Sequence, residues 1–358
     1  MDELLKKALE KPHNLTTDEL VELLSISSHE DMGKLFKAAY SLKERYIGRR
    51  VSIRGLIEWS NICNKNCFYC GIRSGNKKIE RFCLSKEEIL STAEFIHSAG
   101  YGSLVLQGGE LESPVNTDFI SSVLSEIKSR WGNGLGVTLS LGEQEESVYK
   151  QWRDAGAHRY LLRIESSNPK LYEKLHPQGH SFERRVECLH TLKKLGYQLG
   201  TGVMIGLPEQ SLLDLAHDIE FFAKVDADMI GMGPYIPHHD TPLGKSIPVT
   251  PEYMEQQLLL GLKMIAVTRL YLHDVNIAST TALQALAADG RERGLLAGAN
   301  VIMPNATDVG YRAGYQLYEN KPNLDENAEE TMAALEASVK SIGETLRLNE
   351  LGDSPHAK

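Results

Sequence analysis

The chain has 358 residues, of which 42% are hydrophobic and 24% charged, and its formal net charge is −9. This profile is that of a globular protein, and an acidic balance without a basic tract argues against nucleic acid as the main partner. No apolar run reaches the roughly 18 residues of a membrane span, and the charged N-terminal segment lacks an apolar signal core. The sequence therefore predicts a cytoplasmic protein with no membrane or nucleic-acid partner.

Residues 1–50 predict amphipathic helices, with Thr16 or Thr17 as the N-cap of one of them. From Val51 onward, β-rich runs alternate with helical segments. These runs, eight in number, are residues 51–59, 102–107, 136–141, 160–165, 199–206, 227–235, 275–280 and 298–303. Helices are predicted between them at residues 85–100, 181–196, 211–225 and 250–270, with Ser85 and Thr250 as caps.

Strands that alternate with helices form parallel sheets with right-handed crossovers. Eight such units predict an α/β fold of the (β/α)8 TIM-barrel type, and a doubly wound open sheet is the alternative. We divide the chain into an N-terminal helical extension (1–50), the barrel (51–320) and a C-terminal helix and tail (321–358), whose polar end we expect to be frayed. The N-terminal helices and the loop that contains Tyr311 are expected to close the two ends of the barrel.

Three of the five cysteines, Cys63, Cys67 and Cys70, are clustered in the spacing C-x3-C-x2-C. They follow the first predicted strand, where a barrel places its active site. One interpretation is a structural zinc site, for which Cys83 or a histidine would be the fourth ligand. Another is a set of buried structural thiols, the role that we assign to Cys83 and Cys188. The third is a [4Fe–4S] cluster with three protein ligands, which leaves one iron open for a small ligand.

Three motifs together resemble those of the radical SAM superfamily. An aromatic residue, Tyr69, directly precedes the last cysteine of the cluster, QGGE (107–110) follows the second predicted strand, and GVMIGLPE (202–209) overlaps the end of the fifth. The resemblance implies a [4Fe–4S] cluster and S-adenosyl-L-methionine (SAM) as cofactors, and cleavage of SAM by one electron to a 5′-deoxyadenosyl radical. The residues that it places at the cofactors, besides the three cysteines, are Tyr69, Gly108, Gly109, Glu110, Gly202 and Gly206.

Longer stretches, among them RYLLRIES, SFERRVECL, GPYIPHHDTPL and GANVIMPN, are similar to the HydE family of FeFe-hydrogenase maturases over residues 35–318. The resemblance implies that Ser140, Glu165 and Arg185 bind SAM. Glu165 would accept hydrogen bonds from the ribose hydroxyls, and Arg185 would pair with the methionyl carboxylate. The alternatives are a Glu165 paired with Arg163 or Arg159 and a solvated Arg185. The substrate cavity of the family would be lined by Arg159, Thr280, Thr281 and Tyr311.

The same resemblance implies a substrate and partners. The substrate would be a mononuclear iron–carbonyl–cyanide–cysteine complex made by another hydrogenase maturase, and the electron donor a ferredoxin or flavodoxin. A methylornithine synthase-like mutase and a non-enzymatic metal-binding scaffold remain as alternatives. No cysteine follows Cys188, so the accessory cluster that some family members carry near the C-terminus has no thiolate ligands here. His238 and His239 are either further metal ligands or loop histidines with satisfied hydrogen bonds.

Several predicted strand ends carry small or polar residues, whereas barrel interiors are normally filled by branched side chains. These residues predict an internal cavity beside the cluster, and they are Ser140, Gly202, Gly231, Gly233, Ser279, Thr280 and Thr281.

Overall fold

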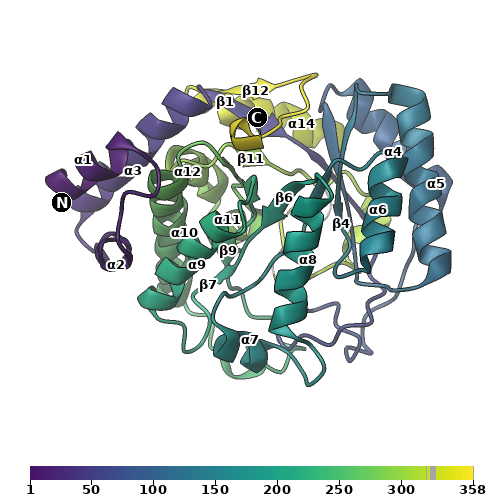
Figure 1. Cartoon of the computed structure of the whole chain (residues 1–358), viewed down its shortest axis with the longest axis horizontal. Coiled ribbons are helices and arrows are strands. Elements are labelled where there is room, and N and C mark those ends of the chain that lie inside the picture. The colour runs from purple at the N-terminus through teal and green to yellow at the C-terminus, as the bar shows by residue number, and fades with distance from the viewer. Residues whose placement is uncertain (320, 323–327, 358) are drawn as a thin grey trace.

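A computed structural model of the chain describes residues 1–319, 321–322 and 328–357, with the backbone alone for 328–331 (Figure 1). The described chain begins with three helices, α1 (Asp2–Glu10), α2 (Thr17–Ser25) and α3 (His29–Tyr46). Thr16 is the N-cap of α2 and forms a reciprocal capping box with Glu19. The residues that precede Val51 are thus helical, as the sequence predicts.

The N-terminal helices cover one side of the barrel instead of closing an end, which corrects the expectation from sequence. They pack against α9 (Leu212–Lys224) and α10 (Pro251–Leu272), beside which they lie in Figure 1. The Thr17 hydroxyl donates to the Glu220 carboxylate at 2.6 Å, and the Lys263 ammonium donates to the Leu24 carbonyl oxygen at 2.6 Å. Their amphipathic faces are buried on these two helices, away from the strand ends.

The strands are parallel and follow one another around the barrel. A seven-stranded sheet has the order β10-β8-β6-β5-β4-β3-β2, and single bridges join the segment after β10 to β11 (Ala278 to Val301) and the segment after β11 to β2 (Leu56 to Asn305). The chain around β11 therefore links the two edge strands of the seven-stranded sheet, β10 and β2. The strands thus follow one another around a barrel, which excludes the doubly wound open sheet. The strands are β1 Arg50–Ile53, β2 Gly55–Ser60, β3 Ser103–Gly108, β4 Gly136–Ser140, β5 Arg159–Leu161, β6 Gln198–Thr201, β7 Met204–Ile205, β8 Met229–Ile230, β9 Gly233–Pro234, β10 Asn276–Ile277 and β11 Val301–Ile302.

Two details of the strands differ from the prediction. The first predicted strand is interrupted at Arg54, so that β1 pairs with β11 and β2 with β3. The fifth and sixth predicted strands are also interrupted, and their second halves form the short parallel pair of β7 and β9. These two strands extend the barrel wall at its carboxyl end.

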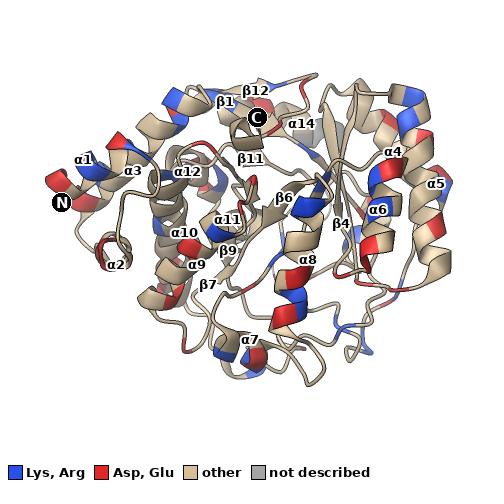
Figure 2. Cartoon of the chain, viewed as in Figure 1, with Lys and Arg blue, Asp and Glu red and all other residues tan. Residues whose placement is uncertain are grey.

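Helices surround the strands, as the alternation in the sequence predicts. Ser85 and Ser211 cap α4 and α9 in capping boxes with Glu88 and Asp214, and Thr250 caps α10. Both signs of charge are interspersed on the outer helices, for example on α6 and α8 in Figure 2. Within the described residues, no helix is long and apolar enough to cross a bilayer. The remaining helices are α4 Lys86–Ser98, α5 Pro114–Trp131, α6 Glu146–Ala155, α7 Pro169–Leu175, α8 Phe182–Lys194, α11 Thr281–Leu286, α12 Gly290–Leu296, α13 Val309–Arg312 and α14 Ala328–Ser341.

The C-terminal tail is ordered and closes the amino end of the barrel, which corrects the expectation of a frayed end. After α14, strand β12 (Thr345–Arg347) pairs with β1. The carbonyl oxygen of Gly352 accepts hydrogen bonds from Arg54 at 3.1 Å and from Asn276 at 3.0 Å. The Leu351 carbonyl accepts one from the hydroxyl of Ser103 at 2.6 Å. These backbone acceptors satisfy polar groups at the start of the strands, which is why the tail remains in place.

His356 gives the docking of this tail a pH dependence. Its ring nitrogens lie 3.1 Å from Asp274 and 2.8 Å from Asp226. The hydrogen bond with Asp274 is the main cause that raises the pKa of His356 to about 9; burial opposes it and Asp226 adds to it. A raised pKa in the folded state means that the protonated ring contributes stability that is complete below the unfolded pKa of about 6.5 and is lost as pH rises through 9.

We therefore expect His356→Gln to lower the free energy of unfolding at about pH 6 and to have no effect at about pH 10. Urea unfolding of the mutant and the unchanged chain at both pH values measures this difference in the free energy of unfolding. The contributions of all other titrating groups are common to the two proteins and cancel in the comparison. A difference that is the same at both pH values would contradict the assignment.

Candidate active site

A cavity of about 340 Å³ lies inside the carboxyl end of the barrel. The last residues of β3, β4 and β9 line it, together with the loops that follow them, so it occupies the position in which a barrel builds its active site. Six of the seven small or polar strand-end residues border it, as the sequence predicts: Ser140, Gly231, Gly233, Ser279, Thr280 and Thr281. Gly202 does not, because it lies against the backbone of Gly231 in the neighbouring strand.

Cys63, Cys67 and Cys70 all line this cavity, and none of them is in a disulfide. Their loop is fixed to three other parts of the chain. The Phe68 amide donates to the Leu175 carbonyl at 2.9 Å, the Gly71 amide to the Leu317 carbonyl at 3.0 Å, and the Glu110 amide to the Cys63 sulfur at 3.4 Å. The loop is thus held in place by backbone contacts, and its thiols face the cavity.

Burial keeps the three thiols protonated in the absence of a metal. It raises the pKa of Cys63, raises that of Cys67 to about 12, and raises that of Cys70 well above its ordinary value. Thiolates are the form that binds metal, so a bound metal must displace these protons. Three partly buried thiols that line one cavity and form no disulfide fit a metal cluster better than a packing role.

The Gly-Gly-Glu segment lies directly against the cysteine loop. A Cβ at Gly109 would collide with the Ile62 carbonyl oxygen, and one at Gly108 would collide with the Trp59 ring. The Gly109 amide donates to the Ser60 carbonyl at 2.9 Å. The backbone therefore comes this close to the loop only because both residues are glycine.

Four charged residues form a compact group beside the cysteines, which we call the charged quartet: Lys65, Glu110, Glu143 and Arg185. The Arg185 Nε donates to Glu143 at 2.5 Å, and its Nη2 lies 3.7 Å from Glu110. The Lys65 ammonium lies 3.0 Å from Glu110 and 3.5 Å from Glu143. The quartet has no net charge, and its carboxylates and cations are arranged so that each carboxylate faces both cations.

Arg185 is 8% exposed and is not the solvated helix residue that the sequence left as an alternative. Burial alone would lower the pKa of Arg185, but Glu143 and Glu110 outweigh it and raise the pKa well above its usual range. Burial also raises the pKa of Glu110, against Arg185 and Lys65, whereas at Glu143 these cations overcome burial and lower the pKa. The group is therefore a network of paired charges around the cavity.

Glu165 is held in an unusual backbone conformation, with a φ of +66°. The Glu165 amide donates to Gly202 at 3.0 Å, and the Glu165 carbonyl accepts from Met204 at 3.0 Å, which fixes the chain there. The Glu165 carboxylate lies 3.1 Å from the Arg163 guanidinium, and burial raises its pKa although Arg163 and Arg185 oppose this. A buried carboxylate on a residue with a strained backbone conformation is typical of a ligand site.

Another part of the cavity wall carries hydroxyl groups and an ion pair. Thr281 exchanges a hydrogen bond with the Tyr318 hydroxyl at 2.7 Å, and the Thr280 hydroxyl is buried without a partner. Lys321 forms an ion pair with Glu58 and also donates to the Tyr315 carbonyl at 3.1 Å. The cavity therefore offers several hydrogen-bond donors besides the cysteines and the quartet.

Comparison with known proteins identifies the family to which this chain belongs. The sequence profile of the radical SAM superfamily matches residues 57–222. The [FeFe] hydrogenase maturase subunit HydE of Thermotoga maritima is 46% identical over 319 residues, which are 89% of this chain and 88% of the relative. The chain belongs to the HydE family of radical SAM enzymes.

More distant relatives of this HydE-family chain share its fold. The 3-methylornithine synthase of Methanosarcina acetivorans is 28% identical over 92% of the chain and 88% of its own length. The crystal structure of methylornithine synthase (PylB) superposes with a TM-score of 0.80, at 25% identity, over 97% of this chain and 98% of that one. The structure of HydG, at 22% identity and a TM-score of 0.77 over 96% of this chain and 75% of that one, confirms the barrel fold alone.

The structure brings most of the predicted cofactor residues of this HydE-family chain to the cavity. Those that line it are Cys63, Cys67, Cys70, Tyr69, Gly108, Gly109, Glu110, Ser140, Glu165 and Arg185. Gly206 does not line it. Its φ of +77° and the hydrogen bond from the Gln257 side chain to its carbonyl at 2.8 Å make it a turn residue behind the wall.

Two predicted substrate residues lie elsewhere. Arg159 begins β5, at the amino end of the barrel, where it donates to Ser103 at 3.0 Å and pairs with Asp353. Tyr311 is in α13 and donates to Glu88 at 2.7 Å on the outside of the barrel. Neither residue borders the cavity, but Tyr315, Leu317 and Tyr318, which follow Tyr311 in the same loop, do. Thr280 and Thr281 do border it.

The cysteines outside the cluster differ from each other. Cys188 is 1% exposed in α8, as expected for a structural thiol. Cys83 is exposed, which corrects the expectation of burial, and it lies outside the cavity lining. A zinc site built from the three cysteines and Cys83 therefore does not fit this arrangement.

Sequence reasoning missed several residues of the cavity wall: Glu58, Arg163, Arg291, Tyr315, Tyr318 and Lys321. It also missed Lys65 and Glu143 of the quartet. Glu143 follows the third predicted strand directly, and Arg163 lies near the carboxyl end of the fourth. Both positions satisfy the rule that barrel sites form after strand ends, so a signal for them exists in the sequence.

His238 and His239 lie on the outer side of the cysteine loop. The His238 Nδ1 accepts from the Asp240 amide at 3.1 Å, and His239 pairs with Glu319 and, at 3.3 Å, with Asp240. One ligand atom of each of His238, His239 and Glu319 also lies within 4.8 Å of the others, so both interpretations from the sequence, loop histidines and metal ligands, fit the structure.

Proposed function

We propose that this chain cleaves SAM reductively to a 5′-deoxyadenosyl radical during assembly of the two-iron subcluster of the [FeFe]-hydrogenase H-cluster. The observation that carries the proposal is the single cavity that joins the three cysteines, the charged quartet and the hydroxyl-lined wall. The radical needs its precursor and its target in one enclosed space, because a primary carbon radical removes hydrogen from almost any donor.

Cys63, Cys67 and Cys70 would hold a [4Fe–4S] cluster through their thiolates, with the fourth iron open. When bound, the cluster supplies the electron that cleaves SAM into methionine and the 5′-deoxyadenosyl radical. The fit rests on three partly buried thiols without disulfides around the cavity and on the Glu110 amide, which already donates to Cys63. Such backbone donors stabilise a thiolate and influence the potential of a cluster.

The charged quartet would bind the amino acid end of SAM. This end is a zwitterion, with one ammonium and one carboxylate, and the quartet offers two carboxylates and two cations. Arg185 has the planar donor fork that suits a carboxylate, and Glu110 or Glu143 can accept from the ammonium. Because these groups already compensate one another, the empty site carries no unpaired buried charge.

Glu165 would accept hydrogen bonds from the ribose hydroxyls of SAM. Its backbone is fixed by Gly202 and Met204, and in the protein its carboxylate pairs with Arg163 at 3.1 Å. Burial raises the pKa of this carboxyl group, and Arg163 opposes that effect by favouring the charged form. Tyr69, Gly108 and Gly109 would position the remainder of SAM against the cysteine loop, and Gly202 and Gly206 would act indirectly by shaping the wall.

Thr280, Thr281 and Arg163 would contact the substrate, which we propose to be an iron–carbonyl–cyanide–cysteine complex made by another maturase. Cyanide nitrogen is a strong hydrogen-bond acceptor, and the unpartnered Thr280 hydroxyl is a donor aimed at no protein group. A ferredoxin or flavodoxin would supply the electron. An open iron site is sensitive to oxygen, so we propose a reducing cytoplasm as the compartment.

A second candidate is a mutase that acts on lysine, favoured by the TM-score of 0.80 with methylornithine synthase. In this case the Glu58–Lys321 ion pair would face the two charged ends of an amino acid.

An anaerobic assay for 5′-deoxyadenosine distinguishes the candidates. The reconstituted full chain is mixed with SAM and a chemical reductant, and then with either a synthetic iron–carbonyl–cyanide–cysteine complex or L-lysine. We expect the iron complex to increase 5′-deoxyadenosine and lysine to leave it at the basal level. Stimulation by lysine alone would replace the proposal with the mutase. A chain with a complete cluster and no 5′-deoxyadenosine under any condition would be a scaffold.

A further inference from the structure

Two histidines lie beside one of the cysteines, outside the cavity lining, and nothing in the proposed function uses them. They are His176, which directly follows α7, and His180, in the loop before α8. We propose that Cys67, His176 and His180 bind one divalent transition-metal ion in the chain that has no cluster, and that iron bound there is the first iron delivered to the cluster site.

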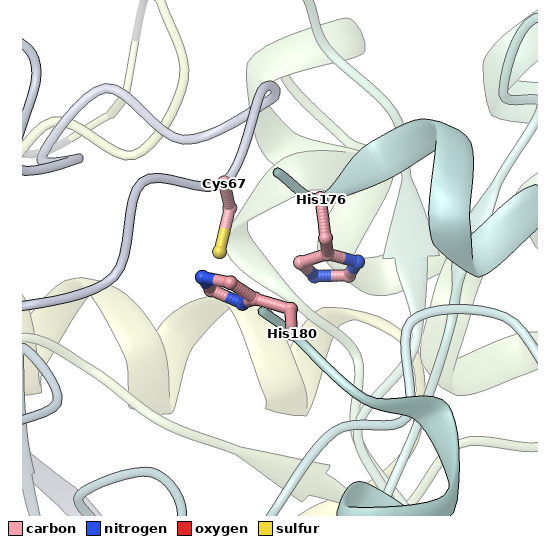
Figure 3. Close-up of side chains that lie close together, drawn as sticks. All are labelled: Cys67, His176 and His180. Carbon is pink, nitrogen blue, oxygen red and sulfur yellow. The ribbon is translucent and has the colours of Figure 1, made fainter. Parts of the chain in front are cut away.

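The three ligand atoms converge from two separate parts of the chain. One suitable atom of each side chain lies within 4.8 Å of the others. Figure 3 shows the ring of His180 directed at the sulfur of Cys67, with the ring of His176 beside it. In a tetrahedral site with metal–sulfur and metal–nitrogen bonds of about 2.3 and 2.0 Å, ligand atoms lie about 3.3–3.7 Å apart. A contraction of roughly 1 Å therefore completes the site, which side-chain rotation in a loop can supply.

His176 is already oriented as a metal ligand. Its Nδ1 lies 2.8 Å from the Tyr172 carbonyl oxygen, and because a carbonyl only accepts, the Nδ1 must carry the hydrogen. The Nε2 lone pair then accepts only a long hydrogen bond, 3.4 Å, from the Tyr69 hydroxyl, which a bound metal would replace. Metal-bound histidines characteristically donate their other N–H to an acceptor such as the Tyr172 carbonyl. The ring is 4% exposed and stacks on Tyr172 with centroids 4.0 Å apart. Its orientation is thus fixed before a metal arrives.

His180 supplies a second, independent observation. Its Nδ1 is buried and has no hydrogen-bond partner among the described residues. Its ring lies nearly parallel to that of His176, with centroids 5.3 Å apart and 22° between the planes. A buried nitrogen without a partner is costly, and coordination of a metal through Nδ1 would remove that cost. One thiolate and two neutral imidazoles form a donor set suited to Fe²⁺, Co²⁺ and Zn²⁺.

Binding of the single ion does not rest on the proposed function. The delivery of iron to the cluster site does, because it requires that Cys67 is also a ligand of the proposed cluster. The single ion and the complete cluster cannot both use this sulfur. Cys63 and Cys70 stay free while the first ion is bound, so further iron can be added next to it. Zinc binds such ligands more tightly than Fe²⁺ and is therefore expected to trap Cys67 and delay cluster assembly.

The direct test is a Co²⁺ titration of the full chain without its cluster, under reducing anaerobic conditions. We expect one Co²⁺ per chain, with the sulfur-to-cobalt charge-transfer band and the intense visible bands of tetrahedral coordination. Cys67→Ala, His176→Gln and His180→Gln should each lose this spectrum. Cys63→Ala and Cys70→Ala, altered in the same loop, are the matched controls and should keep it.

Two results would overturn the site. Equal loss of the spectrum in Cys63→Ala and Cys70→Ala would mean that the three cysteines bind the ion, and an unchanged spectrum in both histidine variants would mean that the histidines are not ligands. His180 is partly exposed in a loop, so its substitution tests the proposal even if the buried His176 is needed for folding.

The delivery step is tested by reconstitution with iron and sulfide after one equivalent of Zn²⁺ is added. We expect zinc to slow cluster formation several-fold in the unchanged chain but not in His180→Gln, with the same final iron content. Equal slowing in both would overturn the delivery role. A chain that binds Co²⁺ as expected but forms no 5′-deoxyadenosine would refute the proposed function and leave the metal site standing.

Discussion

Single replacement of Cys63, Cys67 or Cys70 by Ala is expected to abolish SAM cleavage and to remove most of the iron from the reconstituted chain. Each thiolate holds one iron of the proposed cluster, and two thiolates leave a second iron without a protein ligand. All three sulfurs border the same cavity, so no spare cysteine can replace a lost one. Iron and sulfide analysis after anaerobic reconstitution measures the loss, together with 5′-deoxyadenosine formation.

Cys83 and Cys188 provide the controls for this experiment. Cys83 is exposed and outside the cavity, and Cys188 is buried in α8, where its sulfur lies 3.8 Å from the Gln144 carbonyl. Alanine at Cys83 should leave iron content and activity unchanged, and alanine at Cys188 should cost only packing stability. If Cys83→Ala lost iron as completely as Cys67→Ala, the three-thiolate site would be wrong.

The sequence predicts the barrel because its evidence is local and repeated. Each βα unit carries its own hydrophobic period and its own helix cap, and residues such as Ser85, Ser211 and Thr250 cap in the structure as their positions indicate. The cysteine spacing is also local, and a barrel places whatever follows the first strand at the carboxyl end. These signals need no knowledge of distant contacts.

The tail could not be predicted in this way, because its partners are almost the whole chain away. Strand β12 pairs with β1 across about 295 residues, and Gly352 accepts from Arg54 and Asn276 through its backbone, which leaves no mark in side-chain pattern. A polar segment with glycine and proline is typical of a frayed end. Only the buried polar groups at the start of the strands, which need acceptors, explain why it is ordered.

The two misplaced substrate residues have different causes. Arg159 is the first residue of β5, and Arg163 follows the end of that strand. The residue type alone does not tell which of the two arginines faces the cavity. Arg159 precedes the strand that the sequence predicts at 160–165, so the carboxyl-end rule already favoured Arg163. Tyr311 has no such signal. Its helix, α13, has four residues, and only the contact with Glu88 shows that its hydroxyl faces away from the cavity.

Arg185→Ala is expected to weaken SAM binding by about 1.5–3 kcal/mol, the range for a hydrogen bond to a charged group, or roughly 10- to 150-fold in Kd. The buried guanidinium is the proposed partner of the methionyl carboxylate. Its removal also leaves Lys65 as the only cation of the quartet beside Glu110 and Glu143. The methionyl carboxylate of SAM would then approach two carboxylates whose negative charge is less fully balanced. Titration of the reduced cluster's EPR signal with SAM measures the affinity, and iron content should not change.

Arg184 offers a matched control, because it is the adjacent residue in α8 and is more exposed. It pairs with Glu145 at 2.7 Å and Glu187 at 3.2 Å, outside the quartet, so Arg184→Ala should leave SAM binding unchanged. Arg185→Lys keeps the charge but loses the planar donor fork, and we expect an intermediate affinity. Thermal unfolding of each variant separates lost binding from lost folding. An EPR titration that is the same for Arg185→Ala and the unchanged chain would remove Arg185 from the SAM site and leave it as an internal partner of Glu143.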